Sequence, residues 1–280
     1  MVDLSTVHGL ILDMDGVLWK DHEPIGNLPS IFERIHRLGL KVILATNNAT
    51  KDVQNYLDKL QSFGVKLESW QVVNSSMAAV SYLKRRFPQA GPVYVVGMDG
   101  LKRTLSEAGF DHREQGEVLA VVVGMDRSLT YAKLRRATLL IRAGVPFIGT
   151  NSDRSFPTPD GLAPGAGAIL AAIHTASDVA PIICGKPEPE LYQLAMDRLM
   201  LLPEAVLAVG DRLETDILGG QAIGCRTAVV LSGVATPEAA ASWQPPPDLV
   251  ASELSSVIDI LEEQLTFIGT TGDIDDPGVL

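Results

Sequence analysis

Residues 9–18 read GLILDMDGVL, and two aspartates in this stretch decide how the rest of the chain is interpreted. The apolar residues 10–12 form a run typical of a strand that is buried on both faces. Because a strand interior excludes charge, we expect Asp13 and Asp15 where the strand leaves the sheet. Alternate residues of an extended segment point the same way, with a rise of roughly 3.3 Å per residue. The two carboxyl groups would then face one crevice, where two like charges call for a cation or a shared proton.

A surface turn is the alternative interpretation of the same stretch, since Asp and Gly are both common in turns. The stretch alone does not decide between a turn and a site. The other motifs of the chain are needed to distinguish a surface turn from a functional site.

Composition describes a soluble globular protein. The chain has 280 residues, 46% of them hydrophobic, a net charge of −11 and no apolar run long enough to cross a membrane. The acidic balance disfavours nucleic-acid binding, and no secretory signal is visible. Cys184 and Cys225 lack metal-ligand spacing, and we expect buried, reduced thiols and a cytoplasmic location.

Apolar strand patterns alternate with helical patterns along most of the chain. This alternation predicts an α/β fold, with a doubly wound parallel sheet and helices on both of its faces. A long polar loop is expected at residues 150–164, a helix at 215–223, and a last helix at 254–265. The segment 87–92 is the best candidate for a domain boundary.

Polar clusters follow four of the predicted strands. They are Asp13–Asp15, Thr46–Asn48, Gly185–Pro187 and Gly210–Asp216. Each cluster alone has an ordinary explanation: Thr46 as a helix cap, Lys186 as a solvated side chain, and Asp216 as a carboxylate at a helix start. Because doubly wound folds bind ligands at the carboxyl edge of the sheet, four clusters at that edge indicate a site.

This set of motifs resembles the haloacid dehalogenase superfamily of phosphatases, in its NagD-like (p-nitrophenyl phosphatase) branch. The superfamily's four motifs match Asp13 and Asp15, Thr46, Lys186, and Asp211 with Asp216. The branch is indicated by TNNAT at 46–50, VVVGMDRSLTYAKL at 121–134 and GKPEPELY at 185–192. The resemblance runs from residue 8 to residue 265 and implies a Rossmann-like core with an inserted α/β cap.

The resemblance also implies a role for each motif residue. Asp13 would be the nucleophile that forms an aspartyl-phosphate, and Asp15 the general acid and base. Mg²⁺ would be bound by Asp13, by the main-chain carbonyl of Asp15 and by Asp211, with Asp216 holding a metal-bound water. The phosphoryl oxygens would be bound by Thr46, by residues Asn47 and Asn48, and by Lys186.

The insert lies between the second and third motifs. We expect residues 1–88 and 181–265 to form the catalytic core, 89–180 the cap that sets specificity, and 266–280 a disordered tail. Within the cap, Asn151, Asp153 and Phe156 lie in a stretch that resembles the family's substrate-specificity loop. An ordinary surface loop is the alternative there.

The expected activity is Mg²⁺-dependent hydrolysis of small phosphomonoesters, with a small phosphorylated metabolite as partner, no nucleic acid and no membrane. A homodimer formed through the cap is the expected assembly. The alternatives are another reaction of the superfamily, such as dehalogenation, and a non-catalytic phosphate-binding regulatory module. Sugar phosphates, nucleotides, phosphoglycolate and aryl phosphates all remain open as substrates.

Overall fold

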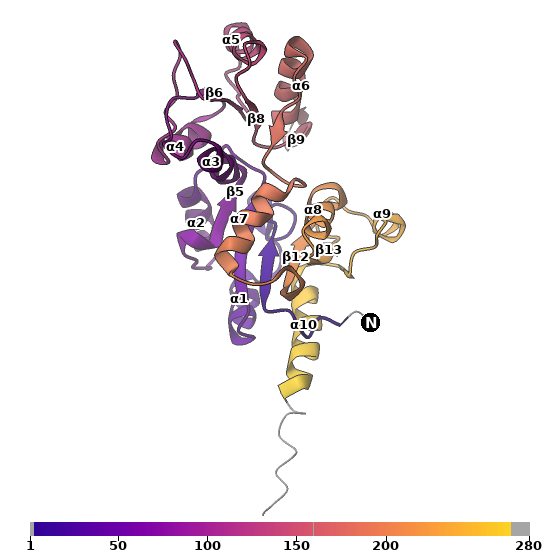
Figure 1. The fold of residues 1–280 in the computed structure, drawn as a ribbon. Helices are drawn as coiled ribbons and strands as arrows, with labels where there is room; N and C mark the ends of the chain where they lie inside the picture. The colour runs from indigo at the N-terminus through magenta and orange to yellow at the C-terminus, as the bar shows by residue number, and fades with distance from the viewer. Residues whose placement is uncertain (1–2, 159, 270–280) are drawn as a thin grey trace, which may run out of the picture. The chain divides into compact units, whose positions relative to one another are not determined.

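The computed structural model describes residues 3–158 and 160–269 (Figure 1). The chain divides into two compact units. The first comprises Met1–Leu44, Ser62–Val65 and Leu199–Leu280, and the second comprises Ala45–Gln61 and Lys66–Arg198. The bounds expected for the cap, 89–180, stay a prediction.

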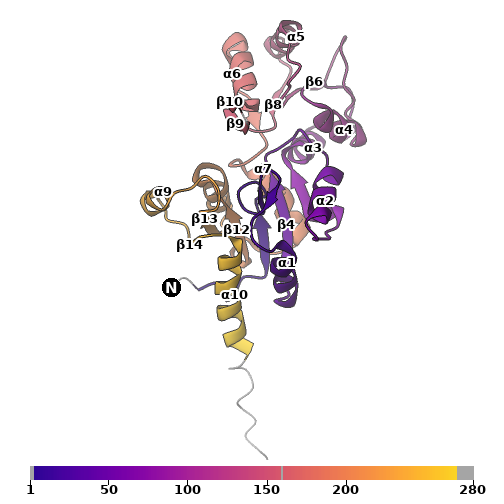
Figure 2. The same ribbon diagram turned by 180° about the vertical axis from the view of Figure 1, so that it is seen from behind.

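A parallel sheet forms the centre of the first unit. Strand β1 (Gly9–Leu12) lies between β12 (Val206–Gly210) and the first four residues of β4 (Lys41–Thr46), and β13 (Arg226–Val230) and β14 (Leu249–Ala251) follow beyond β12 (Figure 2). The chain therefore adds strands on both sides of β1. This order confirms the predicted doubly wound α/β fold.

The strands of this sheet are covered by helices. All four residues of β1 are buried, as in a strand that is packed on both faces. Helix α1 (Leu28–Arg37) begins after Asn27, whose side chain accepts from the backbone of Ser30. It packs against α10 (Leu254–Gly269), and Arg34 forms ion pairs with Asp259 and Glu262 across that contact.

A second parallel sheet belongs to the second unit. Its strand order is β11 (Ile182–Ile183), β8 (Phe147–Gly149), β7 (Val121–Val123) and β6 (Tyr94–Val96). Helices α5 (Tyr131–Arg142) and α6 (Ala166–Ser177) lie side by side against it (Figure 1). Their apolar faces form one core with β6, β7 and β8.

The remaining α-helices and strands that the structure describes are the following: β2 (Trp19–Lys20), β3 (Glu23–Pro24), α2 (Val53–Ser62), β5 (Val72–Asn74), α3 (Ser75–Arg86), α4 (Asp99–Glu107), β9 (Ser155–Thr158), β10 (Gly161–Pro164), α7 (Pro189–Leu199), α8 (Leu218–Ala222) and α9 (Pro237–Ser242). Among the described residues, no helix is both long and apolar enough to span a membrane.

Three elements differ from the sequence-based expectation. Residues 150–164 are not a plain loop, because β9 and β10 form an antiparallel hairpin there. Each of these strands contains a proline, which removes a backbone donor and hides the strand pattern. The helix expected from residue 215 begins with a π-helical turn, Leu213–Ile217, before α8. Helix α10 continues to Gly269, and the rest of the expected tail, 270–280, lies outside the described residues.

Candidate active site

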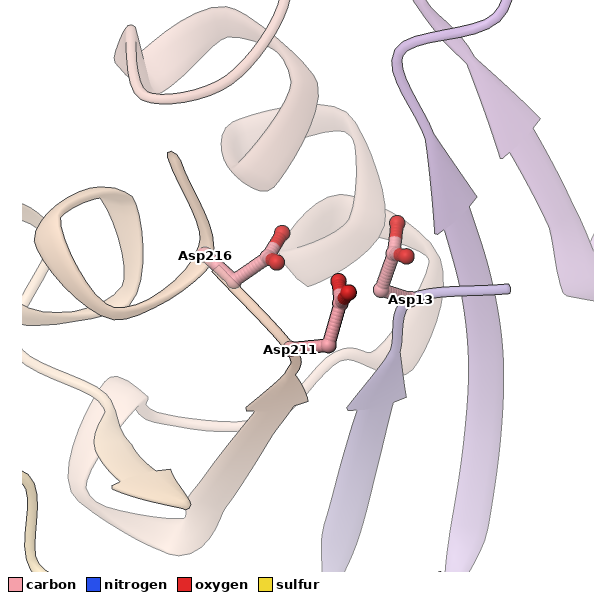
Figure 3. A group of neighbouring side chains, drawn as sticks. All are labelled: Asp13, Asp211 and Asp216. Atoms are coloured by element: carbon pink, nitrogen blue, oxygen red, sulfur yellow. The ribbon is translucent and has the colours of Figure 1, made fainter. Parts of the chain in front are cut away.

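Three carboxylates converge at the carboxyl ends of two neighbouring strands in the first unit (Figure 3). Asp13 directly follows β1, and Asp211 directly follows β12, its parallel neighbour. Asp216 lies on the π-helical turn that comes next. One oxygen from each of the three carboxylates lies within 4.8 Å of the others. The two strand ends that the sequence predicted to meet therefore do meet.

The backbone holds Asp211 closely. The amide of Val234 donates to its Oδ2 at 2.9 Å, and the amide of Ala235 donates to its main-chain oxygen at 2.8 Å. A Cβ atom placed on Gly16 or Gly233 would lie only 2.3 or 1.9 Å from Asp211 Oδ2. Gly16 also has a φ of +87°, so glycine suits this position on both counts.

The negative charge of the three carboxylates would be stabilised by a bound cation. Asp211 and Asp216 are 3% and 2% exposed, and Asp216 accepts from the backbone amide of Arg212 at 3.1 Å. Three carboxylates at this separation repel one another strongly where water is excluded. An all-oxygen set of carboxylates suits a hard divalent cation such as Mg²⁺. The residues present thus fit the metal that the resemblance implies.

The carboxylate of Asp15 is not part of this cluster. Its side chain is exposed, and its Oδ1 accepts from the indole N–H of Trp19 at 2.7 Å. Trp19 lies on β2, a two-residue strand that the sequence pattern did not indicate. The expectation that Asp15 gives a main-chain ligand is compatible with this arrangement.

A second polar group lies in the second unit, around the end of β4. Thr46 is the last residue of β4 and is 3% exposed, and its Oγ1 accepts from the amide of Asn48 at 3.1 Å. The side chain of Asn48 accepts from both the backbone and the hydroxyl of Thr50. These bonds fix the turn that follows the strand.

Asn47 connects this turn to Lys186. Its Oδ1 accepts from the amide of Lys186 at 2.7 Å, and its Nδ2 donates to the carbonyl of Lys186 at 3.0 Å. The ammonium of Lys186 donates to the carbonyl of Ala45 at 3.0 Å, and the residue is 3% exposed. Thr46, Asn47, Asn48 and Lys186 are therefore brought together, as the sequence predicted.

Two residues of the expected specificity loop, Asn151 and Asp153, contact the same group. Asn151 donates from Nδ2 to the main-chain oxygen of Asn47 at 2.8 Å, and its Oδ1 accepts from the amide of Asp153. Asn47 Nδ2 lies 3.4 Å from Asp153 Oδ1. Phe156 lies farther along, on β9, with the guanidinium of Arg127 5.8 Å from the centre of its ring.

The site residues thus fall into two groups, one in each unit. Asp13, Asp15, Asp211 and Asp216 belong to the first unit. Thr46, Asn47, Asn48, Lys186, Asn151, Asp153 and Phe156 belong to the second. That both groups act on one substrate stays a prediction.

Sequence reasoning missed Trp19 and Arg127. Trp19 stands four residues after Asp15, a spacing that a tight turn brings together, but the turn could not be recognised from composition. Arg127 lies within the branch motif at 121–134, so that motif was a signal for it. Neither cysteine competes as a nucleophile, because burial raises the pKa of both thiols, Cys184 and Cys225, to about 12.

Comparisons with known proteins show the family of the chain. Residues 10–111 match the family model described as haloacid dehalogenase-like hydrolase, and residues 183–257 match one described as HAD-hydrolase-like. The acid sugar phosphatase of Staphylococcus epidermidis is 34% identical over 253 residues, which cover 90% of this chain and 97% of that protein.

Solved structures give the same result. The p-nitrophenyl phosphatase from Archaeoglobus fulgidus superposes with a TM-score of 0.86 at 31% identity, covering 91% of this chain and 99% of that one. NagD from Escherichia coli K-12 superposes with a TM-score of 0.83 at 30% identity, covering 89% and 97%. The glycerol phosphate phosphatase Rv1692 from Mycobacterium tuberculosis, in complex with magnesium, has a TM-score of 0.84 at 29% identity, covering 92% and 78%.

These matches cover nearly the whole chain, and they set aside the alternative of a regulatory module. The chain therefore belongs to the haloacid dehalogenase-like hydrolases, in their NagD-like branch, and is a phosphatase.

Proposed function

We propose that this phosphatase is a Mg²⁺-dependent phosphomonoester hydrolase that acts on small phosphorylated metabolites through an aspartyl-phosphate on Asp13. The observation that carries the proposal is the meeting of Asp13, Asp211 and Asp216 within 4.8 Å at the ends of adjacent parallel strands. A site with this much negative charge binds an anionic phosphate ester only with the help of a cation.

The metal would be held by the carboxylates of Asp13 and Asp211 and by the main-chain oxygen of Asp15, with Asp216 acting through a water. When bound, the ion would neutralise the charge on the phosphoryl oxygens. A magnesium complex of the structurally similar glycerol phosphate phosphatase supports this choice of ion.

The chain's own residues would carry out two steps. In the first, a carboxylate oxygen of Asp13 attacks phosphorus, the bond from phosphorus to the ester oxygen breaks, and Asp15 gives its proton to the departing alkoxide. In the second, water attacks the phosphorus of the aspartyl-phosphate and Asp15 takes a proton from that water. The bond to Asp13 then breaks, and inorganic phosphate is released.

Binding of the phosphoryl group would rest on Thr46, on the backbone amides near Asn47 and Asn48, and on the ammonium of Lys186. Thr46 is the last residue of the strand that pairs with β1, and Asp13 follows β1 directly. The side chains of Asn47 and Asn48 already bind protein partners. They would therefore act by shaping the loop, while their backbone amides contact the phosphate.

Sugar phosphates are the substrate class that we propose. The support is the relative from Staphylococcus epidermidis, an acid sugar phosphatase that aligns with this chain over 97% of its own length. On the same loop, the half-buried carboxylate of Asp153 supplies acceptors that suit the hydroxyl groups of a sugar, while the amide of Asn151 is engaged with Asn47 and Asp153 and shapes the loop.

The assembly that we propose is a homodimer through the cap. Large hydrophobic side chains are exposed between residues 89 and 180, namely Tyr131, Leu139, Leu162 and Val179. Two of them, Tyr131 and Leu139, lie on the same helix, α5, and exposed apolar side chains are common components of contact surfaces. Light scattering on the purified chain tests this, and a single monomer mass would contradict it.

The experiment that tests the activity is a phosphate-release screen. Sugar phosphates, nucleotides, phosphoglycolate and p-nitrophenyl phosphate would each be assayed with Mg²⁺ and after chelation and dialysis. We expect hydrolysis only with the metal and the highest kcat/KM for a sugar phosphate. Full activity in excess chelator would contradict the metal assignment, and a clear preference for nucleotides would contradict the substrate class.

A further inference from the structure

Trp19 and Asp15 form a side-chain pair within one tight turn. The indole Nε1 of Trp19 donates to Oδ1 of Asp15 at 2.7 Å. The tryptophan is 1% exposed, whereas the aspartate side chain is exposed. A rigid, buried ring thus holds one oxygen of a carboxylate that faces solvent.

The backbone of the turn closes around the same pair. The amide of Gly16 donates to the carbonyl of Trp19 at 2.8 Å, and the amide of Trp19 lies 3.3 Å from the carbonyl of Met14. Ser232 donates from its hydroxyl to the carbonyl of Gly16 at 2.6 Å. The ring of Phe63 packs on Trp19 with centroids 6.1 Å apart. The donor therefore has little freedom to move.

We propose that Trp19 is a positioning residue for Asp15, fixing the carboxylate so that its second oxygen exchanges the catalytic proton. This inference rests on the proposed function, in which Asp15 is the general acid and base. An exposed aspartate samples several rotamers, and an acid must lie within hydrogen-bond reach of the leaving oxygen. Because the indole N–H donates and never accepts, it binds Oδ1 in either protonation state and leaves the proton to Oδ2.

The chemistry predicts a specific signature. Nitrophenolate leaves without being protonated, whereas an alkoxide has to be protonated as it leaves. Loss of the indole N–H should therefore matter for alkyl phosphates and hardly at all for the departure of nitrophenolate. A tryptophan that served only packing would change both substrates alike.

The experiment uses Trp19→Phe, which keeps an aromatic ring and deletes the donor. Its matched control is Trp243→Phe, which deletes an indole donor to Gln221 in the same unit. For each variant, kcat/KM is measured on an alkyl phosphate, and the first-turnover release of nitrophenolate is measured on p-nitrophenyl phosphate. Asp15→Asn and the double variant with Trp19→Phe complete a cycle.

We expect Trp19→Phe to lower kcat/KM on the alkyl ester by about 10- to 100-fold, and nitrophenolate release by less than about three-fold. In the Asp15→Asn background it should cause no further loss, because there is no catalytic proton left to place. Trp243→Phe should resemble wild type on both substrates. An equal loss on both esters, or a full additional loss in the Asp15→Asn background, would overturn the inference.

The Asp15→Asn variant separates failure of the inference from failure of the proposed function. If Asp15→Asn itself shows no dependence on the leaving group, the proposed acid–base role has failed and the inference fails with it. If the loss in Asp15→Asn depends on the leaving group but the loss in Trp19→Phe does not, the inference has failed and the proposed function stands. Should Trp19→Phe not fold, the same comparison is made with a tryptophan isostere at position 19 that carries sulfur in place of the indole N–H.

Discussion

The side-chain amide of Asn47 pairs with both backbone polar groups of Lys186, accepting from its N–H at 2.7 Å and donating to its carbonyl at 3.0 Å. This pairing fixes the position at which the lysine side chain begins. The ammonium then reaches the carbonyl of Ala45. The side chain of Asn47 therefore positions Lys186 and does not itself bind a phosphate.

Replacing Asn47 by alanine tests this arrangement. The variant loses both bonds to Lys186, so the lysine is held less firmly, and we expect kcat/KM to fall by about 10- to 100-fold. The inhibition constant for inorganic phosphate should rise together with KM. Asn55→Ala, on the exposed surface of α2, is the matched control and should leave both constants unchanged. Unchanged phosphate inhibition in Asn47→Ala would contradict the positioning of Lys186.

The sequence could predict the acidic group because Asp13 and Asp211 directly follow buried strands, and Asp216 lies on the turn that comes next. The apolar runs before Asp13 and Asp211 place both residues at the carboxyl ends of strands. Because β1 and β12 pair in parallel, these two ends lie side by side at the same edge of the sheet. The partners of these residues were not predictable in the same way. The bond from Trp19 to Asp15 and the approach of Gly233 to Asp211 depend on turn geometry and on close packing between distant segments.

The hairpin β9–β10 shows why the local sequence pattern predicted a loop where the second unit has two strands. Its strands are short and contain prolines, and β10 is exposed along most of its length, so the hairpin lacks the alternation of buried and exposed residues that marks a strand. The role of Asn47 was also hidden. Its sequence context indicates a turn, but its partner lies 139 residues away.

Metal binding should be visible in stability as well as in activity. We expect removal of divalent ions to abolish hydrolysis and Mg²⁺ to restore it. Mg²⁺ should also raise the Tm of the wild-type chain, because a ligand that binds only the folded state stabilises it. In Asp211→Asn this gain should be lost, while Asp197→Asn, on the exposed surface of α7, should keep it. An equal Tm gain in all three proteins would contradict the cluster as the metal site.

Specificity should depend on the hairpin and on its neighbour Arg127. We expect Phe156→Leu and Asp153→Asn to change the relative kcat/KM among phosphate esters more than they change hydrolysis of the best aryl phosphate. Arg127→Gln should shift preferences in the same direction as Phe156→Leu, and the two should not add, because they remove one cation–π contact. Arg135→Gln, exposed on α5, is the control. If the variants lowered kcat/KM by one common factor for all substrates, this segment would not set specificity.

Asp126 should make stability depend on pH. Burial raises the pKa of its carboxyl, but hydrogen bonds from Lys133 and Ser128 outweigh burial and hold that pKa below its usual value. The bonds therefore stabilise the fold above the unfolded pKa, near 4, and this contribution is lost as pH falls through the lower folded value. We expect Asp126→Asn to reduce the free energy of unfolding at neutral pH by about 1–3 kcal/mol.

Urea unfolding of wild type and Asp126→Asn at a series of pH values measures this contribution. The difference between the two proteins should shrink as the solution becomes more acidic than the unfolded pKa. A difference that stays constant over the whole series would show that the ionised carboxylate is not the stabilising form.

The central claim is that Asp13 is the nucleophile and Asp15 the general acid and base. Asp13→Asn cannot attack phosphorus and should be inactive on every ester. Asp15→Asn should lose about 10²- to 10⁴-fold on alkyl esters, since it cannot transfer a proton. With p-nitrophenyl phosphate its first step survives, while breakdown of the aspartyl-phosphate still lacks a base.

Rapid-mixing measurement of nitrophenolate release tests the division of roles most directly. Asp15→Asn should give a burst of about one nitrophenolate per active site, followed by slow turnover. Asp13→Asn should give neither burst nor turnover. A burst in Asp13→Asn that is absent from Asp15→Asn would show that the two roles are reversed and would contradict the account.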